Sequence, residues 1–141
     1  MAREPLEQAA AIPFRVRDGV TTICIVTSSS SGKWSVPKGI IDPGFTPQEA
    51  ALVEAEEEAG LSGTLVGAPV GDYLYRKWGM DLHVVVFLMR VTAIAEQWEE
   101  MNLRRRRWAS AEEVLKLVAK HPPVKVLERG LRRIETLRKS P

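Results

Sequence analysis

Apolar residues recur in short stretches that predict β-strands along most of the chain. Two of these stretches, 9–16 and 20–27, flank Asp18-Gly19, a dipeptide that favours the tight turn of a β-hairpin. Residues 82–92 form a nearly continuous apolar run, which is typical of a strand buried on both faces of a sheet. Shorter extended segments are expected at 34–36, 64–66, 71–78 and 104–108, and residues 37–45 are expected to be a loop.

A helix with defined ends is predicted for residues 47–59. Thr46 is the expected N-cap, Pro47 suits the first helical position, and Glu49 completes a capping box. Gly60 then provides a C-terminal stop. A second capped helix opens at 110–113 and a third runs to about 139, so we expect α/β or α+β layers around one sheet.

Length and composition narrow the class of protein. A chain of 141 residues predicts a single domain over residues 1–141, with 1–7 as a loose N-terminus. The net charge of +2 does not require a nucleic-acid partner. No apolar run reaches the roughly 18 residues of a membrane span, and acidic residues near the start argue against a secretory signal. The single cysteine, Cys24, excludes an internal disulfide and favours a reducing, cytoplasmic compartment.

The helix at 47–59 carries an unusual concentration of acidic residues. Glu54, Glu57 and Glu58 are spaced i, i+3, i+4 and therefore share one face. Glu57 and Glu58 also lie in the last turn, where the helix dipole disfavours anions. A solvated charged face is the ordinary explanation of such a pattern. A divalent cation such as Mg²⁺ would remove the conflict, and the glycine-containing loop before the helix can bring backbone oxygens to the same ion.

Residues 39–61, GIIDPGFTPQEAALVEAEEEAGL, resemble the Nudix box. The family has Glu where this chain has Phe45 and Arg where it has Val53, and we expect these two apolar side chains to pack together in place of the charged pair. The residues that match the motif at its spacing are Gly39, Glu54, Ala55, Glu57, Glu58, Gly60 and Leu61.

The resemblance extends from about residue 9 to residue 137. Over this length the chain is similar to the diphosphoinositol polyphosphate and diadenosine polyphosphate branch of the Nudix family. The residues that carry this similarity include Ser28-Ser29-Ser30, Val36-Pro37-Lys38-Gly39, Gly63-Thr64-Leu65, Arg76-Lys77, Trp98-Glu99, Asn102, Trp108 and His121.

The resemblance implies the α/β Nudix fold, a mixed β-sheet sandwiched between helices, and an enzyme. Nudix enzymes cleave a phosphoanhydride bond with an attacking water and Mg²⁺ or Mn²⁺. Carried over, the Gly39 carbonyl and the carboxylates of Glu54, Glu57 and Glu58 would hold the metal. Glu54 and Glu58 are both candidates for the general base, because spacing does not distinguish a ligand from a base. Cationic and polar residues expected at the substrate phosphates are Ser29, Lys33, Lys38, Arg76, Lys77, Arg104 and Arg105.

The substrate remains open among several phosphorylated small molecules. A dinucleoside polyphosphate or a diphosphoinositol polyphosphate is favoured by the branch. Alternatives are a nucleoside triphosphate, ADP-ribose, an RNA 5′ end, or a Nudix-like nucleotide-binding module weakened by the two departures. The tryptophans are expected either to pack in the core or to stack on a base, and Trp78 is the one that we expect to be most exposed. His121 is expected to cap a helix end.

Overall fold

The computed structural model describes residues 4–139. The elements, in chain order, are β1 (Leu6–Arg17), β2 (Val20–Thr27), β3 (Trp34–Ser35), β4 (Lys38–Ile40), α1 (Pro47–Ala59), β5 (Leu61–Leu65), β6 (Gly71–Lys77), β7 (Met80–Ile94), β8 (Arg106–Ser110), α2 (Ala111–Leu117) and α3 (Val124–Lys139).

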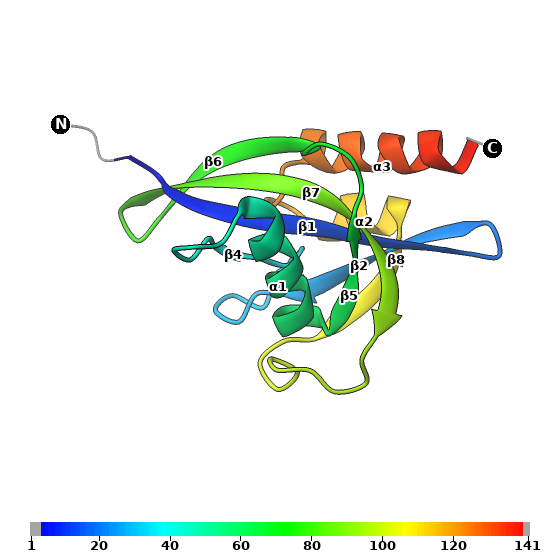
Figure 1. The fold of residues 1–141 in the computed structure, drawn as a ribbon, viewed down its shortest axis with the longest axis horizontal. Coiled ribbons are helices and arrows are strands. Elements are labelled where there is room, and N and C mark those ends of the chain that lie inside the picture. The colour runs from blue at the N-terminus through cyan, green and yellow to red at the C-terminus, as the bar shows by residue number, and fades with distance from the viewer. Residues whose placement is uncertain (1–3, 140–141) are drawn as a thin grey trace.

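The strands form one mixed sheet built around two long neighbours, β1 and β7 (Figure 1). These two strands run parallel, from the pair Leu6–Leu82 to the pair Phe14–Arg90. Antiparallel partners extend the sheet on both sides, with β2 and β4 on β1 and with β5 and β6 on β7. The expectation that residues 1–7 are loose is wrong for residues 6 and 7, because pairing with β7 places them in β1. Residues 1–3 lie outside the described part of the chain.

Helices cover both faces of the sheet, as the expected mixed sheet between helices requires. On one face, Ala9 and Ala11 of β1 pack in one buried cluster with Ala51, Ala55 and Ala59 of α1. These small side chains let the helix backbone approach the strand closely. The other face carries larger residues such as Ile12 and Phe14, which form a second cluster with residues of α2 and α3.

Long-range pairing creates one strand that local sequence did not indicate. Residues 38–40 were expected to be part of a loop, but they form β4 through pairs such as Ala10–Lys38 and Gln8–Ile40. A strand of three residues is too short to show an alternating pattern of apolar residues. Pairing with β1 therefore decides its conformation.

The predicted helix α1 has the expected ends. The Thr46 hydroxyl accepts from the Glu49 N–H at 3.1 Å, and the Glu49 carboxylate accepts from the Thr46 N–H at 2.9 Å. Gly60 ends the helix in the left-handed conformation, with φ of 68°. Both ends thus follow from local chemistry that is readable in the sequence.

The segment between β7 and β8, which we call the capping loop (residues 95–105), closes the C-terminal end of α1 together with Arg106. Helix ends leave carbonyl groups without intrahelical partners. The Glu57 carbonyl accepts from the Glu100 N–H at 3.0 Å, and the Glu58 carbonyl accepts from the Trp98 indole N–H at 3.0 Å. Arg106 donates to the Ala59 carbonyl at 2.8 Å and stacks on the Trp98 ring at 3.8 Å. Arg106 supplies the positive charge that α1 lacks in its own last turn.

No helix among residues 4–139 combines the length and the apolar character needed to cross a membrane.

Replacing Trp98 by Phe tests the capping loop. The variant keeps an aromatic ring for Arg106 but leaves the Glu58 carbonyl without its indole donor. We expect the free energy of unfolding, measured by urea denaturation, to fall by about 1–2 kcal/mol. The matched control is Trp78→Phe, which should cost almost no stability because Trp78 is 77% exposed. Equal stabilities of the two variants would contradict the role given to Trp98.

Candidate active site

Two acidic residues of α1, Glu54 and Glu58, lie against the strand β4 at the centre of the candidate site. Glu58 is only 4% exposed, and its carboxylate accepts a hydrogen bond from the backbone N–H of Lys38. Glu54 lies directly over Gly39, where a Cβ atom would come within 1.8 Å of Glu54 Oε1. The structure thus places Glu54 and Glu58 beside Gly39 and Lys38 of β4. The metal-ligand set expected from the sequence, Gly39, Glu54, Glu57 and Glu58, stays a prediction.

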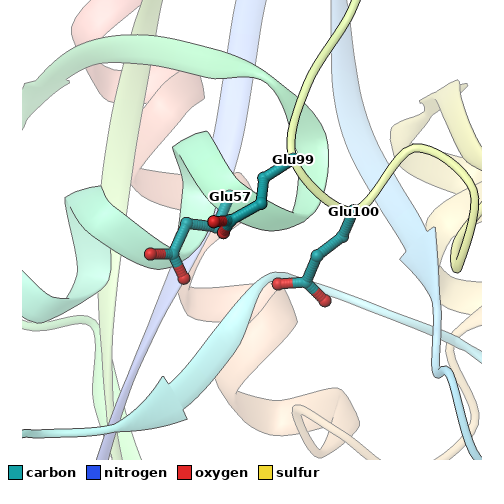
Figure 2. A group of neighbouring side chains, drawn as sticks. All are labelled: Glu57, Glu99 and Glu100. Atoms are coloured by element: carbon teal, nitrogen blue, oxygen red, sulfur yellow. The ribbon is translucent and has the colours of Figure 1, made fainter.

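The capping loop adds two carboxylates that the sequence analysis missed. Figure 2 shows Glu99 and Glu100 of this loop beside Glu57 of α1, and carboxylate oxygens of the three residues lie within 4.8 Å of one another. Sequence position gave no signal for this grouping, because about forty residues separate the loop from the helix. The hydrogen bond from the Glu100 N–H to the Glu57 carbonyl fixes the loop in this place.

Arg104 is the cation that faces these acids. Its Nε atom donates to Glu100 at 2.9 Å, and its guanidinium lies 3.7 Å from the Glu58 carboxylate. A third bond, to the Thr27 carbonyl at 3.1 Å, ties it to β2. Arg104 thus offsets part of the negative charge of Glu58 and Glu100. The role expected for Arg104 from the sequence, contact with a substrate phosphate, stays a prediction.

Burial and mutual repulsion raise the pKa values of the helix acids. Desolvation, followed by the charge of Glu57, raises the pKa of Glu54 to about 7. Desolvation raises the pKa of Glu58 to about 8 despite the opposing effect of Arg104. The pKa of Glu57 is also raised, first by desolvation and then by Glu99. A nearby cation would stabilise the ionised form of these three carboxylates. Glu54, Glu57 and Glu58 therefore suit a hard divalent ion.

A cavity of about 430 Å³ opens beside the acidic group and is lined mostly by cationic, serine and aromatic residues. Glu58 belongs to both, since it also lines the cavity. Among the described lining residues, the cationic ones are Lys33, Lys38, Arg76, Lys77, Arg104 and Lys120.

Most of the residues predicted to contact substrate line this one cavity. These residues come from three separate parts of the sequence. They are Ser29, Lys33, Lys38, Arg76, Lys77 and Arg104. Lys77 on β6 reaches the loop of residues 28–31, which we call the serine loop, with Nζ at 3.5 Å from the Ser30 hydroxyl. Arg105 differs, because it lines a neighbouring recess and its guanidinium lies 5.3 Å from the Trp34 ring centre.

His121 is part of the cavity wall, and the expectation that it caps a helix is wrong. Its ring lies against Tyr73 and Tyr75, with ring centres 5.7 and 4.4 Å away. Desolvation lowers the pKa of His121, and Lys38 lowers it further. The aromatic contacts arise from β6, which is distant in sequence, so local patterning did not reveal them.

The two departures from the Nudix box lie at the surface. Phe45 is 47% exposed in the turn before α1, and Val53 is 37% exposed on the helix. The contact expected between their side chains stays a prediction.

Stability of the metal-free protein should depend on pH through Glu58. Because its pKa is higher in the folded state than the usual 4.5, the folded state binds more protons between these values. The contribution of Glu58 to the free energy of unfolding is therefore fully present below its ordinary pKa of 4.5 and is lost as the pH rises through about 8.

We expect Glu58→Gln, which resembles the protonated acid, to flatten this dependence in urea denaturation with EDTA at pH 5.5 and pH 8.5. The matched control is Glu56→Gln, at an exposed position of the same helix. A slope in Glu58→Gln as steep as in wild type would show that burial of this carboxylate is not the cause.

Comparisons with known proteins identify the family and the fold of the chain. The family model for the NUDIX domain matches residues 6–129. The chain is 32% identical over 120 residues to diphosphoinositol polyphosphate phosphohydrolase 2 of Homo sapiens, covering 84% of this chain and 65% of that protein. It thus spans just under two thirds of the length of this curated relative.

Solved structures share the fold. The C. elegans Ap4A hydrolase matches with a TM-score of 0.75 at 19% identity, covering 94% of this chain and 99% of that one. The NUDIX domain of Shewanella oneidensis NrtR, complexed with ADP ribose, matches with a TM-score of 0.75 at 17% identity over 94% of this chain and 90% of that one. With the family model covering most of the chain and a curated relative above 30% identity, the protein belongs to the Nudix family.

Proposed function

We propose that this protein is a Mg²⁺-dependent hydrolase that cleaves a phosphoanhydride bond in a polyphosphorylated small molecule. The observation that carries the proposal is the junction of two opposite charge environments at Glu58. On one side of this residue lie the carboxylates of α1 and the capping loop. On the other side lies the cavity with six cationic side chains among its described lining residues. Such a junction suits a substrate whose phosphates need cations while a metal ion needs carboxylates.

The carboxylates of Glu54, Glu57 and Glu58 and the carbonyl of Gly39 would hold the metal, and Glu99 and Glu100 are further candidates. When bound, the metal neutralises phosphate charge and makes an attacking water more acidic. Mn²⁺ would serve the same donors.

Proton transfer falls to Glu54 or Glu58. Burial raises the pKa values of both in the metal-free protein, and a bound cation would lower them again and keep the carboxylates ionised, as a proton acceptor must be. The cavity cations hold the substrate phosphates, together with Ser29. Within residues 4–139, the side-chain ammonium groups of Lys33 and Lys120 form no hydrogen bond or ion pair, so they are free to bind phosphate.

The favoured substrates are dinucleoside polyphosphates and diphosphoinositol polyphosphates. Relatives at about 32% identity carry the second name, and a structural neighbour is an Ap4A hydrolase. The test is cleavage of a panel of these two substrates, a nucleoside triphosphate, ADP-ribose and an RNA 5′ end, with and without Mg²⁺, followed by chromatography of all phosphorylated products. Absence of metal-dependent cleavage of every member would favour a binding module instead.

Replacing Glu57 or Glu58 by Gln removes a negative oxygen from the metal site without changing its shape. We expect kcat on the best substrate to fall by about 100-fold or more, while the melting temperature in the absence of metal does not decrease. Glu56→Gln, at an exposed position on the same helix, is the matched control. Wild-type turnover in both site variants would defeat the assignment.

Gly39→Ala tests the contact between β4 and α1. The new Cβ would occupy the place of the Glu54 carboxylate, which lies at the end of a flexible side chain and can move aside. We expect turnover to fall by about 100-fold with little change in melting temperature, because the fold survives but Glu54 is displaced. A variant that retains full turnover would show that the position of Glu54 does not matter.

A further inference from the structure

The chain contains two tight hairpin turns with the same backbone signature but very different residues. Asp18-Gly19 connects β1 to β2 with φ values of 52° and 75°. Trp78-Gly79 connects β6 to β7 with φ values of 53° and 72°. Two-residue turns with positive φ at both positions favour Asn-Gly or Asp-Gly. The first turn follows this preference, whereas the second places a bulky tryptophan in a strained conformation.

Packing gives no reason for this tryptophan. The Trp78 side chain is 77% exposed, so it contributes little to the core. It nevertheless lines the cavity beside Arg76 and Lys77. Backbone strain that neither turn chemistry nor burial explains is characteristic of ligand-contacting positions.

The other aromatic rings of the cavity are more enclosed than Trp78. Trp34 is covered by the Arg105 guanidinium at 5.3 Å, and Tyr75 contacts both Lys38, at 5.1 Å, and the ring of His121. Trp78 has the Lys77 ammonium 4.4 Å from its ring centre, and most of its surface is open to solvent. It is therefore the ring best placed to receive a flat group from a ligand.

We infer that Trp78 is a stacking platform for the heterocyclic base of a nucleoside polyphosphate whose phosphates occupy the cationic cavity. The placement of the phosphates rests on the proposed function, and the inference deepens it by naming a nucleotide as the substrate class. A polyphosphorylated cyclitol has no flat π-face, so it would gain more from a cation than from an indole at this rim. A heterocyclic base would stack on the indole of Trp78, and the nearby Lys77 ammonium would hold the first phosphates of the same nucleotide.

The experiment compares two ligands that differ in the base alone. Dissociation constants for adenosine 5′-tetraphosphate and inorganic tetraphosphate are measured by calorimetry in EDTA, so that turnover does not interfere. We expect wild type to bind the nucleotide about tenfold more tightly than the inorganic chain. Trp78→Ala should abolish most of this ratio and Trp78→Phe should retain part of it. Leu74→Ala is the matched control, because Leu74 is 66% exposed on the preceding strand β6 and does not line the cavity.

A second variant separates ligand binding from folding. Trp78→Asn converts the turn to Asn-Gly, and we expect its melting temperature to rise by about 2–4 °C while the nucleotide preference disappears. A wild-type ratio near one, a ratio unchanged in Trp78→Ala, or a lower melting temperature in Trp78→Asn would each overturn the inference. If the ratio behaves as expected but no member of the substrate panel is hydrolysed with Mg²⁺, the proposed function is rejected and the base-binding site is retained.

Discussion

The close packing of α1 against β1 is the constraint on which the candidate site depends. Alanines on both surfaces, among them Ala55 and Ala9, leave no room for solvent between helix and sheet. The same packing presses Glu54 over Gly39 and buries Glu58 against Lys38. Carboxylates placed in such surroundings bind protons or cations tightly, which is why their pKa values are raised. The small residues that let α1 pack closely on β1 are therefore also the reason that the pKa values of Glu54 and Glu58 are raised.

The capping loop both stabilises the C-terminal end of α1 and supplies carboxylates to the candidate site. Trp98 and the Glu100 N–H provide hydrogen-bond donors for the last carbonyls of α1, a role that any helix end of this kind requires. The same loop carries Glu99 and Glu100 to within reach of Glu57. A loop that detached from the helix would therefore remove both the helix cap and two carboxylates.

The two sides of the site differ in how their charge is arranged. The acidic side is crowded and tied to the backbone, with Arg104 bridging Glu100 and Glu58. The cationic side is an open cavity whose lysines come from separate loops and strands, and Lys77 is linked to the serine loop by a long contact of 3.5 Å. The acidic side is therefore held in place by its ion pairs, whereas the cationic side is open and bounded by side chains from separate elements.

The sequence by itself determined the features that depend on neighbouring residues. The ends of α1 follow from Thr46 and Gly60, the β1–β2 turn follows from Asp18-Gly19, and the shared face of the acids follows from helical spacing. The tertiary structure alone decided the rest: the strand β4, the stacking of His121, and the approach of Arg106 and Glu100 to α1. These contacts join segments tens of residues apart, and their free energy comes from pairing and burial that exist only after the sheet has formed.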